Sequence, residues 1–297
     1  MRGIARLRQL LRRKWAGYTP ISALDRTQFD QDMLRPVPQQ QYVMFFTPRS
    51  GSSRVADLLS RTKRMGRVTE SFNPNFMPNM TRAMNAASLE DYCLMLERRM
   101  QKGRVAGFQI TQPQLQVVFG NESRFLARYG HCPTIWLIRR DLVLQAVSLY
   151  KMVTTGVSHS PHLSADALHH AAAGLIYDAA AICYWIDHLR HIERATEALI
   201  ARLQETGAQA PLRLCYEDNA AAPAAACIRA IAAHIGVDLP QGLAFVSSHR
   251  KVGNDRNQQF AERFRNEHPA LINRLERERA TMLGKIAPLP TPDAAPP

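Results

Sequence analysis

The sequence predicts an α/β domain in which a parallel β-sheet is flanked by helices on both faces. Short apolar runs rich in β-branched and aromatic residues alternate with longer stretches of helical periodicity. Such alternation favours a parallel sheet, because each connecting helix packs back onto it. With 297 residues, 46% of them hydrophobic, the chain is long enough to bury one large core.

Four apolar runs are the expected strands, at residues 42–47, 105–110, 134–138 and 212–216. Apolar spacing predicts helices around 55–64, 85–102, 143–150, within 165–205, after Pro223 and over 256–280. We expect residues 21–41 to be irregular, because they are polar and contain two prolines. One domain is therefore expected over residues 21–286, between a basic arm (1–20) and a disordered Pro- and Ala-rich tail (287–297).

The formal net charge of +13 predicts an anionic partner. The N-terminal arm supplies six of these charges and carries apolar residues at helical spacing among them. Such an arm suits peripheral contact with an anionic membrane surface, although a solvated or packed helix is the alternative. The rest of the chain is only moderately basic, so we do not expect nucleic acid as a partner.

Targeting and cysteine usage favour a cytoplasmic protein. No stretch approaches eighteen uncharged apolar residues, and the basic N-terminus lacks the clean apolar run of a signal peptide. The five cysteines are scattered without CxxC spacing, which is typical of reduced, buried thiols. We expect no metal site, and the sequence does not indicate an oligomeric state.

The loop after the first expected strand, Pro48-Arg49-Ser50-Gly51-Ser52-Ser53, has the composition of an anion site. Gly51 permits backbone angles closed to other residues, and the helix that follows directs free N–H groups to one spot. The loop is not a nucleoside-triphosphate P-loop, because Ser52 stands where that motif has lysine. An ordinary strand-to-helix turn is the alternative interpretation.

A second candidate anion site pairs Arg140, at the end of the third expected strand, with Ser148 in the following helix. Both side chains reach one phosphate if the strand end curls over the first turns of that helix. The alternative interpretation is a solvated arginine and an ordinary helix serine. If only one of the two residues were present, this alternative would be preferred.

Together these features resemble the sulfotransferases that use 3′-phosphoadenosine 5′-phosphosulfate (PAPS). The segments 139–141 and 145–149 are most similar to the bacterial carbohydrate branch typified by trehalose 2-sulfotransferase, as is Tyr216-Glu217-Asp218 more weakly. The resemblance implies a P-loop-like fold of the sulfotransferase type, no metal, and 3′-phosphoadenosine 5′-phosphate as product. It implies that Arg140 and Ser148 hold the 3′-phosphate and that Tyr216 lies near the adenine. The residues implied to cradle the phosphosulfate are Pro48, Arg49, Ser50, Gly51, Ser52 and Ser53.

In-line sulfuryl transfer needs a base for the acceptor hydroxyl and positive charge at the leaving oxygen. Arg49 is the candidate for the charge. Glu70 matches the carboxylate that the resemblance implies as base, with a surface glutamate or one of ten histidines as alternatives. The relatives carry a basic residue where this chain has Gln109-Ile110-Thr111-Gln112, so its acceptor or sulfate contacts are expected to differ.

The expected acceptor is a sugar or glycolipid, with its identity and the sulfated hydroxyl left open. Three other hypotheses remain. A nucleotide kinase on a related fold would have a lysine in the loop after the first strand, and this chain lacks that lysine. A basic protein that binds polyanions or membrane surfaces predicts strongly salt-dependent binding. The third hypothesis is a relative that binds the nucleotide but has no activity. Only an activity assay distinguishes it from an active sulfotransferase.

Overall fold

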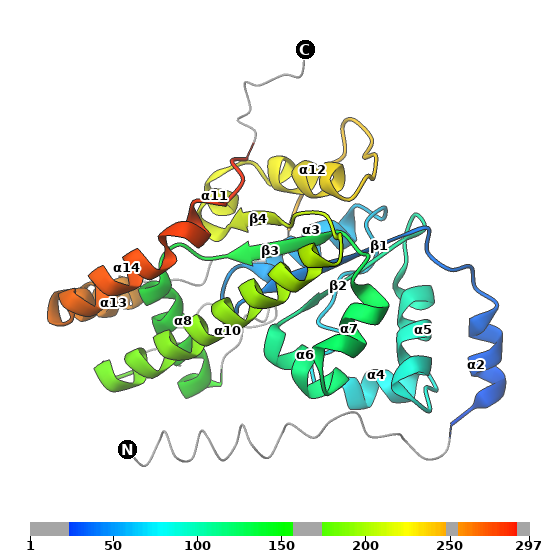
Figure 1. Cartoon of the computed structure of the whole chain (residues 1–297), viewed down its shortest axis with the longest axis horizontal. Helices are drawn as coiled ribbons and strands as arrows, with labels where there is room; N and C mark the ends of the chain where they lie inside the picture. Colours follow the sequence, from blue (N-terminus) through cyan, green and yellow to red (C-terminus); the bar gives the residue numbers. More distant parts are fainter. Residues whose placement is uncertain (1–23, 157–173, 248–254, 290–297) are drawn as a thin grey trace.

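The computed structural model describes residues 24–156, 174–247 and 255–289. In these residues four parallel strands form one sheet in the order β2-β1-β3-β4 (Figure 1). The strands are β1 (Gln40–Phe46), β2 (Val105–Ile110), β3 (Thr134–Ile138) and β4 (Leu212–Cys215). The predicted α/β fold with a parallel sheet is thereby confirmed. The N-terminal arm (1–20) and most of the C-terminal tail lie outside the described residues.

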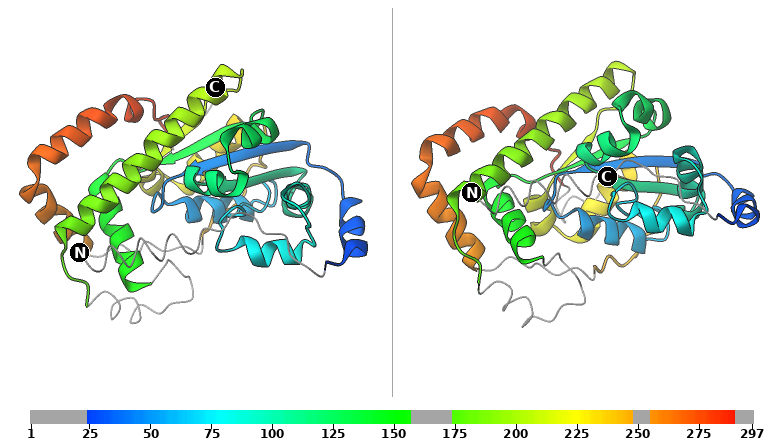
Figure 2. Two further views of the ribbon diagram at one scale, coloured as in Figure 1. Left: turned by 60° about the horizontal axis from the view of Figure 1, so that its bottom comes forward. Right: turned by 90° about the horizontal axis from the view of Figure 1, so that it is seen from below.

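Helices cover both faces of the sheet, as predicted (Figures 1 and 2). On one face lie α3 (Ser52–Arg61) and α12 (Ala224–His234). The other is covered by α5 (Leu89–Met100), α6 (Gln112–Phe119), α7 (Glu122–Tyr129) and α10 (Ala179–Glu205). The remaining described helices are α2 (Arg26–Met33), α4 (Met77–Ala83), α8 (Leu142–Thr155), α11 (Tyr216–Ala221), α13 (Asp255–Glu267) and α14 (Pro269–Leu283).

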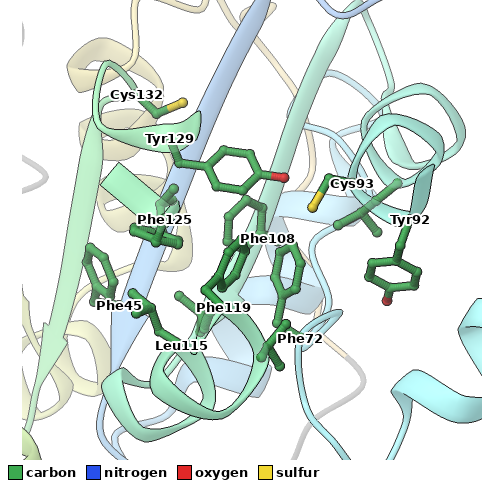
Figure 3. Close-up of a cluster of buried hydrophobic side chains, with 14 of the residues drawn as sticks. Phe45, Phe72, Tyr92, Cys93, Phe108, Leu115, Phe119, Phe125, Tyr129 and Cys132 are labelled. Carbon is green, nitrogen blue, oxygen red and sulfur yellow. The ribbon is translucent and has the colours of Figure 1, made fainter. Parts of the chain in front are cut away.

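Alternating strand residues divide the interior into two cores, because successive side chains point to opposite faces of a sheet. Phe45 of β1 and Phe108 of β2 belong to the larger core, under α5, α6 and α7. This core is rich in aromatic rings (Figure 3), and the ring centroids of Phe72 and Phe108 lie 4.8 Å apart in an edge-to-face contact. Met44 and Phe46 face the smaller core, under α3 and α12. The alternation along the strands thus decides which side chains face each of the two helical layers.

Three expectations about local structure were wrong. Residues 21–41 are not irregular throughout, because Asp25 caps the helix α2 by accepting a hydrogen bond from the Gln28 N–H. Tyr216 does not end the fourth strand but begins α11. The expected helix over 256–280 is two helices, and the break lies at His268, directly before Pro269.

Further helices gather at the carboxyl end of the strands. There α8 follows β3 and packs on α10, α13 and α14 around a third apolar cluster that includes Ile186 and Phe264. Figure 1 shows α8, α13 and α14 together at one end of the sheet. In open α/β sheets this is the edge at which ligands bind.

Candidate functional site

The loop between β1 and α3 has the backbone of an anion site. Arg49 and Gly51 both adopt the left-handed region, with φ of 69° and 79°. This conformation costs a non-glycine residue about 1–2 kcal/mol, and such strain clusters at functional sites. Gly51 is the N-cap of α3, with no side-chain cap and no acidic residue in the first turn. The first N–H groups of the helix therefore remain available to an anionic ligand.

The serines of this loop differ in their surroundings. Ser50 is only 1% exposed, and its Oγ makes no hydrogen bond in the described structure. An unsatisfied buried hydroxyl is costly, so its presence calls for an explanation. Ser52 is buried as well, whereas Ser53 is exposed. The orphaned Ser50 hydroxyl fits a loop built to receive oxygen atoms of a ligand.

Gln145 of α8 fixes this loop from the side. Its Nε2 donates to the hydroxyl of Thr47 at 2.8 Å and to the carbonyl of Pro48 at 2.7 Å. Gln145 is fully buried, so these bonds form away from competing water. The loop and the helix that carries Ser148 are therefore held as one unit.

Arg49 turns its guanidinium toward α8. Its Nε donates to the Ser148 Oγ at 3.0 Å. Burial, with the nearby charge of Arg139, lowers the pKa of Arg49 to about 10. The pKa of Lys151 is also lowered, first by burial and then by Arg49 and Arg256. Neither Arg49 nor Lys151 forms an ion pair with a carboxylate of the described residues, so their positive charge is uncompensated there.

Tyr216 joins the loop to the end of β3. A Cβ atom added to Gly51 would lie 2.7 Å from Cδ2 of Tyr216, so the ring packs directly on the glycine. The Arg139 guanidinium lies over the same ring, with its Cζ 4.6 Å from the centroid. Arg139 also donates through Nη1 to the Arg49 carbonyl at 3.1 Å. Tyr216 and Arg139 thus line the loop that the sequence identified.

Arg140 and Ser148 are not hydrogen-bonded to each other. Arg140 is half exposed and binds both carboxylate oxygens of Asp218, at 3.1 and 3.0 Å. Ser148 accepts the hydrogen bond from Arg49 instead. The hydroxyl of Ser148 still has its own hydrogen to donate. Ser148 therefore contacts the loop through Arg49, whereas Arg140 is bound by Asp218 of α11, and each keeps a hydrogen that it can donate.

Glu217 anchors the turn between β3 and α8. Its carboxylate accepts from the backbone N–H groups of Arg140 (2.9 Å) and Asp141 (3.2 Å) and lies 3.6 Å from the Arg139 Nε. Burial acts to raise the pKa of Glu217, but hydrogen bonds from Cys215 and these N–H groups outweigh it, so the pKa is lowered. The carboxylate therefore remains ionised and holds the turn in place.

Glu70 lies in the loop before α4, beside β2. Its Oε2 accepts from Asn73 Nδ2 at 2.7 Å and from Gln114 Nε2 at 3.1 Å. The orientation of the Gln114 amide is fixed because its Oε1 accepts from the Thr111 N–H in a capping box. Two amides thus tether one oxygen of the half-buried Glu70 carboxylate and leave Oε1 for another partner.

The sequence did not identify Arg139, Gln145, Lys151, Glu217 or Gln114 as contributors. Gln114 had a local signal, since Thr111-Gln112-Pro113-Gln114 fits a capping box. Arg139, Gln145 and Glu217 lie in the segments that carry the family resemblance, but no role was expected for them. Their contacts depend on the strand order. In the described residues, no group of three His, Cys, Asp or Glu side chains is placed to hold a metal ion. None of the described helices is long and apolar enough to cross a membrane.

A comparison with protein families identifies one that matches the sequence. The family model for the Stf0 sulphotransferases matches residues 95–267, which is more than half of the 297 residues. Arg140, Ser148 and Tyr216 lie within the matched stretch, whereas the loop 48–53 and Glu70 precede it. No curated protein matches the chain.

Proposed function

Because the chain belongs to the Stf0 sulphotransferase family, we propose that it transfers a sulfuryl group from PAPS to a hydroxyl group of a carbohydrate or glycolipid. The observation that carries the proposal is a group of three features at the carboxyl edge of the sheet. They are the free N-terminus of α3, the orphaned hydroxyl of Ser50 and the unpaired charge of Arg49. Each of these features favours an anionic ligand.

The donor supplies the activated sulfuryl group, and residues of this chain bind and orient it. The N–H groups of the loop 48–53 and the Ser50 hydroxyl suit the phosphosulfate. Arg140 and Ser148 suit the 3′-phosphate, because Ser148 keeps its hydroxyl hydrogen and Arg140 keeps N–H groups beyond the two bound by Asp218. Tyr216 is proposed to lie near the adenine, and its ring packs between Gly51 of the loop and Arg139.

Arg49 and Glu70 have opposite tasks in the proposed reaction. Negative charge grows on the leaving oxygen, and a fixed cation there stabilises the transition state without reorganisation. Arg49 is held for that task by Ser148. Glu70 is proposed to accept the proton of the acceptor hydroxyl through Oε1, since Asn73 and Gln114 occupy Oε2.

The acceptor class is supported by the polar groups around Glu70. Asn73 and Gln114 offer amide donors and acceptors beside the carboxylate, and Gln109 is buried with its Oε1 unpartnered in the described structure. Hydroxyl-rich ligands such as sugars need many such partners. A sugar or glycolipid acceptor is therefore proposed for this side of the site.

Ligand-induced thermal stabilisation tests the donor assignment. PAPS and 3′-phosphoadenosine 5′-phosphate should raise Tm, and ATP should do so far less. Arg140→Ala should weaken binding of both 3′-phosphorylated nucleotides by about tenfold or more, because a hydrogen bond to a charged group contributes about 1.5–3 kcal/mol. Arg274→Ala, at an exposed arginine of α14, is the matched control. If neither 3′-phosphorylated nucleotide stabilises the protein, the donor assignment is wrong.

Transfer of labelled sulfate from PAPS into a panel of sugars and lipid extracts tests the reaction itself. Label in a carbohydrate or glycolipid product is the expected result. Donor binding without transfer to any hydroxyl acceptor would instead indicate a relative that has kept only nucleotide binding.

A further inference from the structure

A surface rich in basic side chains lies at the opposite end of the sheet from the proposed site, where β1 and β2 begin. Three chain segments form it, residues 34–41, 61–68 and 98–106, and none of them contains Asp or Glu. We call this surface the basic end. Its cationic residues are Arg35, Arg61, Lys63, Arg64, Arg67, Arg98, Arg99, Lys102 and Arg104.

Backbone contacts hold the three segments side by side. The N–H of Gln39 donates to the Arg104 carbonyl at 2.8 Å, which joins the first segment to the third. The N–H of Arg67 donates to the Met100 carbonyl at 2.7 Å, which joins the second to the third. Gly103 lies so close to Arg64 that an added Cβ would be 3.1 Å from the Arg64 Cα. The cations therefore belong to one surface.

Few carboxylates compensate this charge. Asp57 pairs with Arg61, and Asp32 pairs with Arg35 and Arg99. Five exposed cations form no ion pair within residues 24–156, 174–247 and 255–289: Lys63, Arg64, Arg67, Lys102 and Arg104. Clustered like charges repel one another, so an anionic partner is favoured at the basic end.

Exposed aliphatic side chains border these cations. Leu34 is 86% exposed and Val37 is 53% exposed. Both lie in the first segment, which the side chain of Gln101 also holds by donating to the Pro36 carbonyl. Large apolar side chains beside basic ones are typical of surfaces that insert into the boundary between lipid headgroups and acyl chains. Exposed aliphatic side chains do not contribute to phosphate contacts with nucleic acid, which are made by charged and polar groups.

We propose that the basic end docks on an anionic membrane surface. Lys63, Arg64 and the neighbouring cations bind the headgroups, while Leu34 and Val37 enter the interface. The proposed sulfotransferase site opens at the other end of the strands, so docking leaves it uncovered. This inference does not depend on the proposed reaction.

Co-sedimentation of the full chain with phosphatidylcholine vesicles, with and without phosphatidylserine, tests the proposal. Binding should require the anionic lipid and weaken with added salt. Each basic residue near such a surface contributes about fivefold in affinity, so Lys63→Gln with Arg64→Gln should weaken binding by roughly 30-fold. Arg263→Gln with Arg274→Gln, two exposed cations of α13 and α14, is the matched control and should bind as wild type.

Two further variants make the result decisive. Leu34→Ser with Val37→Ser should weaken vesicle binding and leave binding to duplex DNA unchanged. Equal loss with both probes, or DNA binding without vesicle binding, would show a general polyanion site and overturn the proposal. In a variant with Arg2, Arg6 and Arg8 changed to Gln, the Lys63 and Arg64 changes should still weaken vesicle binding. If that variant alone abolishes binding and the Lys63 and Arg64 changes have no effect, the basic end is not the docking surface.

Discussion

Arg279 of the C-terminal helix should be a main determinant of both stability and donor affinity. Its buried guanidinium donates to Glu193 through Nε at 3.1 Å and Nη2 at 2.8 Å. It also donates to the carbonyls of Arg140 at 2.7 Å and Arg139 at 2.5 Å. One side chain of α14 thus supports the strand end that presents Arg139 and Arg140 to the site.

Arg279→Met removes this support at similar side-chain length. Glu193, which is 1% exposed, would keep only Arg190 as a charged partner, and two carbonyls would lose their donors. Breaking a buried ion pair costs about 3–5 kcal/mol, which corresponds to a fall in Tm of roughly 5–8 °C for a chain of this size. Arg279→Met/Glu193→Met should recover part of this loss, because the buried carboxylate that has lost one of its two arginines is then absent, and Arg190 keeps Glu278 as a partner.

Thermal unfolding and donor titration measure the two effects. Arg274→Met, on the same helix, should hardly change Tm, because Arg274 is exposed and lies 3.9 Å from Glu278. A Tm for Arg279→Met within about 2 °C of wild type would refute the energetic argument. A normal donor affinity in the variant, at a temperature where it is folded, would show that Arg279 stabilises the fold without positioning the site.

Three further predictions concern the proposed site. Glu70→Gln should lower kcat by about 100-fold or more with little change in donor Kd, and full activity in this variant would move the base elsewhere. Gly207→Ala should lose about 1 kcal/mol of stability, because its φ is positive and nothing lies near an added Cβ. Gly51→Ala should lose more, because its φ is also positive and its Cβ meets Tyr216, and only this variant should lose donor binding. Donor affinity should fall at strongly alkaline pH, since burial lowers the pKa of Arg49 and a bound anion favours its charged form; a flat profile would contradict this.

The sheet could be predicted where the chain gives unambiguous local signals. The apolar runs at 105–110 and 134–138 coincide with β2 and β3, because breakers and polar residues bound them on both sides. The helix α2 gives no such signal, since only Phe29 and Asp32 of its eight residues are buried. Its stability comes from the Asp25 cap and from contacts with α5, including the Arg26–Asp91 ion pair. Such long-range partners cannot be read from periodicity.

The site could be predicted as a pair of motifs but not in its contacts. Adjacent residues at a strand end point in opposite directions, so the sequence does not tell which of Arg139 and Arg140 turns inward. The structure buries Arg139 against the loop and leaves Arg140 half exposed on Asp218. Glu217 reaches the same place only because β4 is the neighbour of β3 in the sheet. Strand order is a property of the whole fold, so no local pattern reveals it.

The distribution of carboxylates at the carboxyl edge explains why this edge should select an anion. Four of its arginines have a carboxylate partner: Arg139 has Glu217, Arg140 has Asp218, Arg265 has Asp141 and Arg279 has Glu193. Arg49 and Arg54 form no ion pair in the described structure, and Arg54 donates to the Asn219 carbonyl instead. Arg49 has only the hydroxyl of Ser148 and the sulfur of Met152. Burial and the nearby charge of Arg139 disfavour the charged form of Arg49 and lower its pKa. A ligand with negative charge at this point removes that cost, so part of its affinity arises from a charge that the fold leaves unpaired.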